Sequence, residues 1–226
     1  MRSLLVLKAL SHRETGGIVA AATTSLPEKI AGQRNWDYRY CWLRDATFTL
    51  YALIEQGFVE EAGAWRDWLL RAVAGSPDHL QIMYGIAGER RLEEYTLSRL
   101  SGYERSSPVR IGNAAATQLQ LDVYGEVLDA LYVSRKAGLP SEAESWPLEC
   151  ALLAHLESIW EQPDNGIWEV RGDRRHFVHS KVMAWVAFDR GIRSAREFDL
   201  EGPVARWLDL RRPFTTRSAK ADLIRA

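Results

Sequence analysis

The sequence has little of several features that define common protein classes. Only two of its 226 residues are cysteines, Cys41 and Cys150, which are too few for a disulfide framework and favour a reduced compartment. The 29 basic and 30 acidic residues leave a net charge of −1, so the composition favours neither nucleic acid nor an acidic membrane surface as a partner. No Gly-rich phosphate loop is present either, and we expect no nucleotide or other cofactor.

Long hydrophobic runs are also missing. No stretch approaches the roughly 20 apolar residues that a membrane-spanning helix needs. The apolar run near the N-terminus is interrupted by Lys8 and has no small-residue cleavage site, which argues against a signal peptide. We therefore expect a cytoplasmic protein without a membrane partner.

Aromatic residues, in contrast, are abundant. Nine tryptophans and eight tyrosines are many for this length, and we expect most of them to pack in the core. Sugar-binding sites also use flat rings, because the apolar C–H face of a pyranose stacks on a ring while its hydroxyls need a polar rim. The aromatic content is therefore compatible with a protein that binds carbohydrate.

Apolar residues recur at helical spacing through most of the chain from Asp45 onward. In the clearest segment Asn113 is positioned as an N-cap and Gly138 ends the helix, and Ser141 and Glu144 form a capping box before another helix. We therefore predict an all-α fold of antiparallel helix pairs, with only weak strand signals. The predicted helices cover 45–57, 60–75, 113–138, 141–160, 179–198 and 202–210, and the strand-like pieces are 16–21, 80–86 and 176–178.

Two of the predicted loops are long for a helical domain. They cover residues 76–112 and 163–177. Loops of this length in a compact fold usually carry function. No repeat of fixed period indicates a solenoid.

The first candidate site lies in the segment RNWDYRYCWLRD. Trp42, Arg44 and Asp45 fall within four positions, and Tyr38 lies just upstream. A carboxylate beside a guanidinium can accept hydrogen bonds from vicinal hydroxyls and donate to them, and the indole supplies a stacking face. The structural alternative is that Asp45 caps a helix and Arg44 pairs with a surface acid, and on this segment alone that alternative is the stronger one.

The second candidate site is the loop PDNGIWEVRGDRRHFVHSK. Glu169 lies between Trp168 and Val170, an apolar setting that raises a carboxyl pKa by desolvation, as a general acid needs at neutral pH. The alternative is a glutamate on a solvent-exposed loop. His176 and His179 have the spacing of a metal pair, but no third ligand stands out nearby, and we expect no metal site.

A third segment, GYERSSPVRIGNAAATQ, places Arg110 ahead of the longest predicted helix. Arg110 either lines a pocket or shapes a loop around Gly112, which permits close backbone approach. The sequence slightly favours the loop role, and Arg110 is kept as a candidate substrate-binding residue.

Together, RNWDYRYCWLRD, SSPVRIGNAAATQLQLDVYGEVLDAL and NGIWEVRG resemble glycoside hydrolase family 15, which holds the glucoamylases and the bacterial α,α-trehalase-like enzymes. The likeness covers residues 16–210, and three motifs in the family's order are more specific than any one of them. It implies a partial (α/α)6 barrel, an incomplete toroid of helical hairpins, with the active site formed by loops between paired helices. It also implies hydrolysis of a terminal α-glucosidic bond with inversion, in an α-glucoside or α-glucan substrate.

The resemblance implies roles for individual residues of the first motif. Trp42, Arg44 and Asp45 match residues that hold the nonreducing glucose, and Tyr38 matches a position near the reacting centre. Trehalose is the favoured substrate, because the bacterial branch is the closer likeness. Maltose and longer α-glucans remain open, since they present the same nonreducing glucose.

Glu169 matches the family's general acid, and Trp168 beside it would line the sugar pocket. An inverting enzyme also needs a second carboxylate, about 6.5–9.5 Å from the acid, that activates water on the opposite face of the sugar. Nothing after Glu169 matches the family's base, and Glu197 and Glu201 carry no family motif. We therefore expect the general base to be absent from this chain.

The end of the sequence departs from the family. Residues 211–226 have no apolar period, and a frame shift in one of many synonymous back-translations gives a string like the family's continuation. We expect residues 1–210 to form an incomplete catalytic domain and residues 211–226 to be an aberrant, frameshifted tail. An incomplete ring of helices would also leave apolar faces exposed.

Two other interpretations remain open. The chain could be a non-catalytic remnant that at most binds a sugar through Trp42, Arg44 and Asp45. It could also be an all-α carbohydrate-binding or terpenoid-type barrel unrelated to hydrolysis, which would leave the IWEVRG motif unexplained.

Overall fold

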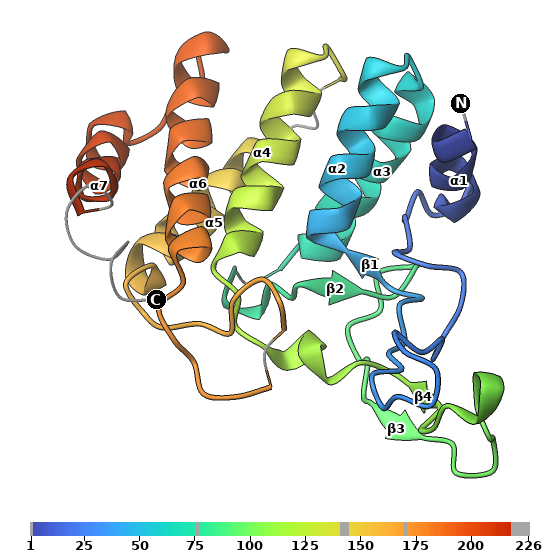
Figure 1. Cartoon of the computed structure of the whole chain (residues 1–226). Coiled ribbons are helices and arrows are strands. Elements are labelled where there is room, and N and C mark those ends of the chain that lie inside the picture. Colours follow the sequence, from blue (N-terminus) through green and yellow to red (C-terminus); the bar gives the residue numbers. More distant parts are fainter. Residues whose placement is uncertain (1, 76, 141–144, 170, 218–226) are drawn as a thin grey trace. The chain divides into compact units, whose positions relative to one another are not determined.

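The computed structural model is mainly helical with a few short strands (Figure 1), and it describes residues 2–75, 77–140, 145–169 and 171–217. The α-helices are α1 (Arg2–Leu10), α2 (Leu43–Glu55), α3 (Val59–Val73), α4 (Asp122–Lys136), α5 (Ser145–Ile159), α6 (Val178–Glu197) and α7 (Val204–Arg217). The strands are β1 (Cys41–Trp42), β2 (Met83–Tyr84), β3 (Tyr95–Thr96) and β4 (Arg110–Ile111), and the 3₁₀ helices are η1 (Pro77–His79), η2 (Tyr103–Arg105) and η3 (Ala114–Thr117). The chain divides into two compact units, residues 1–72 with 81–117 and residues 73–80 with 118–226, and each unit is described by itself.

The first unit contains α1, α2 and α3. Gly57 makes the turn between α2 and α3 with a φ of 77°, in the left-handed region that favours glycine. α3 contributes Trp65 and Trp68 to the core, where both are buried. The Trp68 ring meets the Tyr84 ring edge-on, with 6.2 Å between the ring centroids. Much of the tryptophan content therefore goes into packing, as the composition predicts.

Two short antiparallel ladders hold the loops of the first unit. β1 pairs with β2, which sets Trp42 opposite Met83, and the Leu43 N–H donates to the Ile82 carbonyl at 3.0 Å. β3 pairs with β4 in the same way. Because β1 leads directly into α2, the first ladder fixes where that helix begins.

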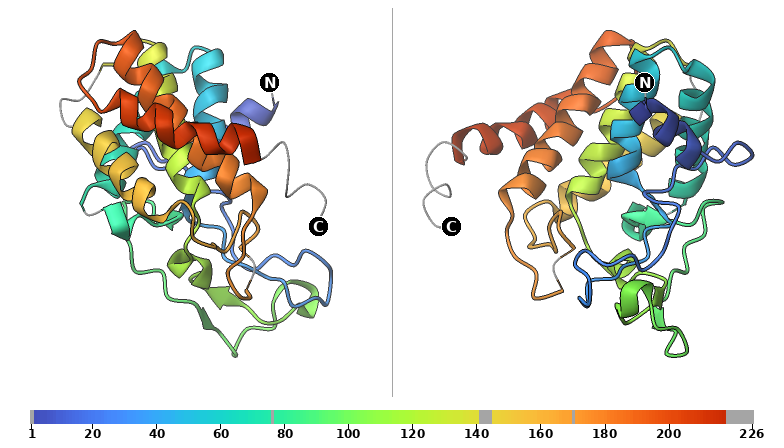
Figure 2. Two further views of the ribbon diagram at one scale, coloured as in Figure 1. Left: turned by 90° about the vertical axis from the view of Figure 1, so that its left-hand side faces the viewer. Right: turned by 45° about the vertical axis from the view of Figure 1, so that its right-hand side comes forward.

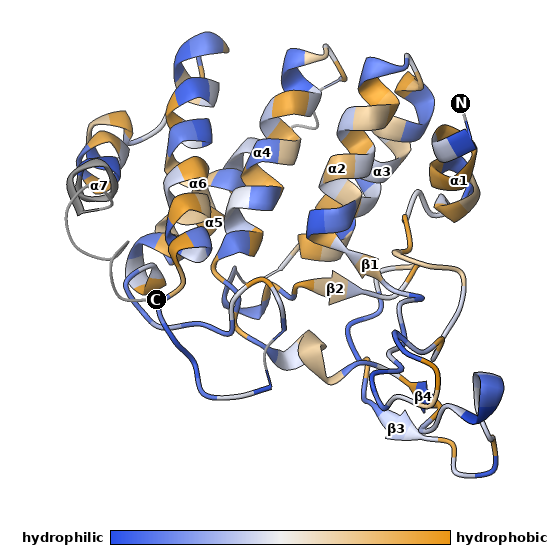
Figure 3. Cartoon of the chain, viewed as in Figure 1, coloured by the Kyte–Doolittle hydropathy of each residue, from blue (hydrophilic) through white to orange (hydrophobic). Residues whose placement is uncertain are grey.

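The second unit contains α4, α5, α6 and α7. α4 and α6 lie side by side (Figure 1), and α7 packs against α6 (Figure 2). A Cβ on Gly125 of α4 would lie 2.3 Å from the Met183 carbonyl oxygen, so the close approach of α4 and α6 requires glycine there. Apolar and polar residues alternate along these helices (Figure 3), and the apolar ones form their shared core.

Buried ion pairs join the helices of the second unit. Asp189 of α6 is 2% exposed, and Arg190 and Arg211 each donate to it at 2.6 Å, the latter from α7. Glu149 of α5 is fully buried and pairs with Arg135 of α4. The Asp189–Arg211 and Glu149–Arg135 pairs each join two helices, and removal of Arg135 or Glu149 would leave an uncompensated buried charge.

The predicted helices are largely present, with shifted boundaries. Those at 45–57, 60–75, 179–198 and 202–210 correspond to α2, α3, α6 and α7. The helix predicted from Asn113 begins only at Asp122, because Asn113 caps the short turn η3, where its Oδ1 accepts the Ala115 N–H at 3.0 Å. The predicted capping box at 141–144 lies outside the described residues, and the helix that follows is α5.

The remaining expectations for local structure have mixed outcomes. Strand β2 lies within 80–86, but 16–21 is not a strand, because the Ala20 and Ala21 N–H groups donate to single carbonyls of Tyr40 and Tyr38. Residues 176–178 are not a strand either, because α6 begins at Val178. Helix α1 is a further difference, since the sequence analysis predicts helices only from Asp45 onward.

Helix α7, the exposed apolar residues and the hydropathy of the helices bear on the expectations for the C-terminal tail, the surface and the membrane. α7 continues through residues 211–217, and residues 218–226 lie outside the described part. Phe48, Val178 and Val182 are exposed apolar residues on α2 and α6. Within the described residues, no helix has the length and apolar character needed to cross a membrane.

Candidate functional site

Tyr38 and Trp42 lie together just before α2. Trp42 belongs to β1 and is only 4% exposed, because the pairing of β1 with β2 holds its backbone against the core. The Tyr38 ring centroid lies 5.7 Å from that of Trp42, with the planes inclined at 47°, and Tyr38 is 38% exposed. The Tyr40 ring also contacts Trp42, at 6.4 Å. The first unit therefore presents one partly exposed ring supported by a buried one.

A buried carboxylate anchors this aromatic segment, residues 36–42. Asp37 is fully buried and accepts hydrogen bonds from the Arg39 guanidinium at 2.8 and 2.9 Å, from the Tyr40 hydroxyl at 3.3 Å and from the Gly112 N–H at 3.2 Å. The Asn113 side chain donates to the Asp37 carbonyl oxygen at 3.3 Å. The segment is thus fastened to residues 112–113, which lie far away in the sequence.

The ionisation of Asp37 follows from these contacts. Burial by itself would raise the pKa of the Asp37 carboxyl, but the hydrogen bonds and charge of Arg39 and the Gly112 N–H outweigh it, so the pKa lies below its ordinary value. Burial, together with the negative charge of Asp37, raises the pKa of Tyr40. At neutral pH Asp37 is therefore a carboxylate and Tyr40 is a phenol that donates to it.

Arg44 and Asp45 lie in the first turn of α2. The Arg44 guanidinium and the Asp45 carboxylate approach to 3.7 Å, and 20% of the Arg44 side chain and 52% of the Asp45 side chain are exposed. Asp45 is not the helix cap, since Trp42 holds that position and makes no capping bond through its side chain. The carboxylate lies where the N-terminal end of the helix dipole favours negative charge, and it is accessible from solvent.

Arg110 has a largely structural setting. Its guanidinium lies over the Trp36 ring at 4.5 Å, donates to the carbonyls of Gln33 and Asn35 at 2.9 and 3.2 Å, and pairs with Glu94 at 3.4 Å. The side chain is only 15% exposed. These contacts clamp the loop before the aromatic segment, in line with the loop role that the sequence slightly favours.

In the second unit, loop 163–177 is tied to the chain just before α4. Asp164 is fully buried, and its Oδ2 accepts the Leu121 N–H at 2.9 Å. The Asn165 N–H donates to the Leu119 carbonyl at 2.9 Å, and its Oδ1 accepts the Leu119 N–H at 3.2 Å. Asp164 and Arg175 exchange two backbone hydrogen bonds of 2.9 and 2.8 Å, which close the neck of the loop.

Trp168 and Glu169 lie in the part of this loop beyond the neck. Trp168 is 82% exposed, and Glu169 is half-buried. Glu169 has a φ of 47°, in the left-handed region that non-glycine residues occupy only where the surroundings hold them. The expected desolvation of Glu169 by its indole neighbour stays a prediction, because that ring is itself mostly in solvent.

The two later glutamates singled out in the sequence have local partners. Glu197 accepts hydrogen bonds from the Tyr132 hydroxyl and from Lys136, each at 3.1 Å. The bond from Lys136 lowers the pKa of Glu197. The backbone carbonyl of Glu201 accepts the Trp146 indole N–H at 2.8 Å. Glu197 thus links α4 to the end of α6.

The candidate residues fall into the two units. Tyr38 contacts Trp42 and Arg44 lies beside Asp45 in the first unit, where Arg110 is turned to Trp36. Trp168 and Glu169 belong to the second unit. Among the described residues, no group of three or more His, Cys, Asp or Glu side chains is arranged to hold a metal ion.

Residues 1–218 match glycosyl hydrolases family 15. The chain belongs to this family. Its relatives include a trehalase of Mycobacterium tuberculosis (strain ATCC 25618 / H37Rv), 44% identical over 91% of this chain and 31% of the trehalase. A trehalase of Thermoplasma acidophilum (strain ATCC 25905 / DSM 1728 / JCM 9062 / NBRC 15155 / AMRC-C165) is 41% identical over 92% of this chain and 35% of its own length. The chain thus spans about a third of the length of these trehalases.

More distant similarities concern other named activities and the fold. An isomaltose glucohydrolase of Kribbella flavida (strain DSM 17836 / JCM 10339 / NBRC 14399) is 27% identical over 81% of this chain and 46% of its own length. A wild-type glycosidase of known structure has a TM-score of 0.64 and 20% identity, over 96% of this chain and 55% of that one. A variant glycosidase in complex with glucose has a TM-score of 0.62 over the same shares. The predicted fold class of this family 15 chain, an all-α partial (α/α)6 barrel, is confirmed.

Sequence reasoning missed two anchoring residues. Asp37 lies inside the first motif and Asp164 inside the second, yet neither motif predicts an anchoring role for them. The short spacing from Asp37 to Arg39 is the one local signal in the sequence that these two side chains pair. The bond of Asp37 to Gly112 and that of Asp164 to Leu121 join segments far apart in the sequence, so no local pattern predicts them.

Proposed function

We propose that this chain contributes to hydrolysis of a terminal α-glucosidic bond, with inversion, in an α-glucoside such as trehalose. Membership of family 15 supports the reaction class, and the trehalases at 44% and 41% identity support trehalose as the substrate. Maltose and longer α-glucans offer the same nonreducing glucose, and the isomaltose glucohydrolase is a relative with a different named substrate.

The observation that carries the proposal is the arrangement at the start of α2. The exposed part of Tyr38, supported by the buried Trp42 ring, offers an apolar face for a pyranose ring. Arg44 and Asp45, 3.7 Å apart, offer a donor and an acceptor for neighbouring sugar hydroxyls. Because Asp45 is half-exposed and is not the helix cap, its carboxylate is available for such hydrogen bonds.

Glu169 is the proposed general acid. It would donate its proton to the glycosidic oxygen as the bond to the anomeric carbon breaks, and water would attack that carbon from the opposite face. An inverting enzyme activates this water with a second carboxylate, for which the sequence of this chain offers no match. Trp168, whose ring is 82% exposed, would contact the sugar beside it. Arg110 would act on the substrate only through the loop that it clamps, since its guanidinium is committed to Trp36, Glu94 and backbone carbonyls.

A second candidate function is binding of a glucoside without hydrolysis. Glu197 is engaged with Lys136 and Tyr132, and its lowered pKa suits an ion-pair partner. This setting favours a structural role for Glu197 over the role of general base. The proposed sugar-binding residues at the start of α2, which are Tyr38, Trp42, Arg44 and Asp45, do not depend on a general base. The chain could therefore bind a sugar without hydrolysing it.

We also propose a reduced, cytoplasmic compartment. Cys41 and Cys150 are free thiols. Burial raises the pKa of Cys41 to about 12, so this thiol stays protonated at neutral pH and acts as a small core residue.

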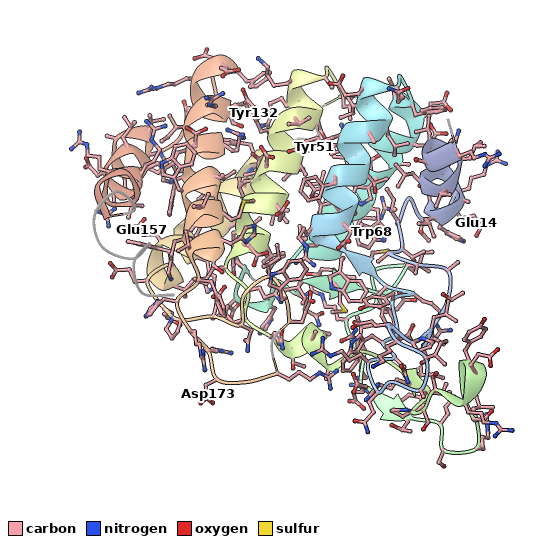
Figure 4. The ribbon with its side chains drawn as sticks, in the orientation of Figure 1. Glu14, Tyr51, Trp68, Tyr132, Glu157 and Asp173 are labelled. Carbon is pink, nitrogen blue, oxygen red and sulfur yellow. The ribbon has the colours of Figure 1, made fainter. Side chains whose placement is uncertain are left out.

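Glucose release from trehalose and maltose tests the two candidate functions. Any turnover by the wild-type chain should fall about 10²–10⁴-fold in Glu169→Gln, which keeps the shape of the side chain but cannot act as an acid. Glu14→Gln, at an exposed glutamate of the first unit (Figure 4), is the matched control and should leave the rate unchanged. A wild-type chain that binds glucose but releases none would favour the binding function, and turnover that survives Glu169→Gln would contradict the assignment of the acid.

A further inference from the structure

Loop 163–177 combines a buried base with an exposed outer part. Asp164, at the base, is fully buried, whereas Trp168 is 82% exposed and the described residues 171–176 are exposed. Asp173 lies at the outer end of the loop and points into solvent (Figure 4). The buried base of the loop is therefore one place from which the position of Glu169 can be fixed.

The base is held by a group of contacts on both sides. The Lys181 ammonium of α6 donates to the carbonyls of Trp160 and Gln162 at 2.6 and 2.7 Å, which holds the chain that leaves α5. Gly166 has a φ of 68°, and a Cβ there would lie 2.8 Å from the ring of Phe177 at the other end of the loop. The two ends of the loop are thus packed against each other.

Asp164 makes the central tie. Its backbone pairs with Arg175 across the neck, and its carboxylate accepts the Leu121 N–H, at the residue that caps α4. A carboxylate at the N-terminal end of a helix is further stabilised by the helix dipole. Asp164 therefore joins the closure of the loop, through its backbone, to the start of a 15-residue helix that packs against α6, through its carboxylate.

We propose that Asp164 is a positioning residue for the general acid. It fixes the base of loop 163–177 on α4, so that Glu169 is held in its strained conformation with a φ of 47°. This inference rests on the proposed function of Glu169. Asp164 itself takes no part in the proton transfer, and it acts by limiting where the Glu169 carboxyl can be.

The expected effect follows from the sensitivity of proton transfer to distance. A displacement of about 1 Å can lower a rate about 10²-fold, because the acid must lie within hydrogen-bond reach of the glycosidic oxygen. Loss of the Asp164 tie should therefore lower kcat more than it changes KM. The proposed sugar-binding residues at the start of α2 belong to the first unit, where the bonds of Asp37 hold their segment independently of Asp164.

The test compares three variants of the full chain. Asp164→Ala removes the acceptor for the Leu121 N–H, and we expect kcat on trehalose to fall about 10–100-fold with KM changed less than about twofold. Asp164→Asn keeps an oxygen at the same place, and we expect it to retain kcat within about fivefold of wild type, because a neutral acceptor is weaker than a carboxylate. Asp173→Ala, at the exposed end of the same loop, is the matched control and should match wild type.

Backbone amide exchange measured by NMR provides a readout that is independent of turnover. The Leu121 and Asn165 amides, which donate to Asp164 and to Leu119, should exchange faster in Asp164→Ala and not in Asp173→Ala. If Asp164→Ala does not fold, Asn165→Ala removes the neighbouring side-chain acceptor of the Leu119 N–H and is assayed in the same way.

Three results would overturn the proposal: equal kcat in Asp164→Ala and Asp173→Ala, unchanged exchange at Leu121, or an Asn variant as slow as the Ala variant. A wild-type chain without turnover would instead contradict the proposed function. In that case the exchange measurement still decides whether Asp164 holds the loop.

Discussion

The aromatic segment, residues 36–42, and loop 163–177 carry the proposed site residues in two different ways. The aromatic segment is held at both ends. The Asp37 carboxylate accepts hydrogen bonds from Arg39, Tyr40 and Gly112, and the Trp42 ring is buried in the core. The loop is held at its base, where Asp164 and Asn165 bind the chain before α4, and Trp168 beyond the neck is mostly in solvent.

This difference matches the two proposed tasks. A group that binds a sugar gains affinity when its rings are already in place before the sugar arrives, because less conformational entropy is then lost on binding. A general acid needs a defined position together with access to the leaving group. We therefore expect substitutions in the aromatic segment to act mainly on stability, and substitutions in the loop to act mainly on turnover.

The largest expected contrast is between two tryptophans. Trp42→Ala should lower the free energy of unfolding by about 3–5 kcal/mol, because it empties a buried site. Trp168→Ala should change it by less than about 0.5 kcal/mol, because the ring is 82% exposed. Urea unfolding measures both values. Similar losses from the two variants would contradict the contrast between a buried segment and an exposed loop.

Glycine-to-alanine substitutions at Gly112, which bonds to the aromatic segment, and at Gly166, in loop 163–177, compare the stability of the two regions. Gly112 has a φ of 80°, and a Cβ there would lie 1.8 Å from the Glu93 carbonyl oxygen, so Gly112→Ala should cost about 3 kcal/mol or more. Gly166 faces the Phe177 ring, which can move, so Gly166→Ala should cost less, about 1–2 kcal/mol. Gly57→Ala is the control for positive φ alone, since nothing lies within 4 Å of its Cβ position, and thermal unfolding of the three variants ranks them.

A smaller and pH-dependent effect is expected at Asp37. Asp37→Asn should cost about 2 kcal/mol at neutral pH, because it removes the charge from the buried acceptor of the Arg39 guanidinium. The pKa of Asp37 in the fold lies below its ordinary value, so the carboxylate stabilises the fold above that ordinary value, and this stabilisation is lost as the pH falls through the lowered one.

The difference between Asp37→Asn and wild type should therefore shrink below about pH 4. Urea unfolding at a series of pH values measures it, with Asp173→Asn as the exposed control. A difference that stays constant from pH 7 to the acid range would show that the charge of Asp37 does not contribute.

Much of the fold could be predicted from the sequence, and the reasons are local. α2, α3 and α6 follow from apolar residues at helical spacing, and Gly57 ends α2 as expected. The start of α4 was misplaced, because a capping residue such as Asn113 serves a short 3₁₀ turn as well as a helix. Nothing local distinguishes the two uses.

The candidate site was predictable only in part. Tyr38, Trp42, Arg44 and Asp45 are close in sequence and remain close in the fold, so their motif carries most of the information. Arg110 was ambiguous, because its partners Trp36 and Glu94 come from separate segments. Asp37 and Asp164 act through residues that are 75 and 43 positions away, and such contacts leave no periodic signal in one sequence.

The central claim is that Glu169 protonates the leaving group of a glucoside. The most direct test compares Glu169→Gln with wild type on two substrates, trehalose, whose leaving group needs a proton, and α-glucosyl fluoride, whose leaving group needs almost none. We predict that the variant loses trehalose hydrolysis by about 10²–10⁴-fold while its rate on the fluoride stays within about tenfold of wild type. Equal losses on both substrates would contradict the account, because they would mean that Glu169 supports the site without acting as its acid.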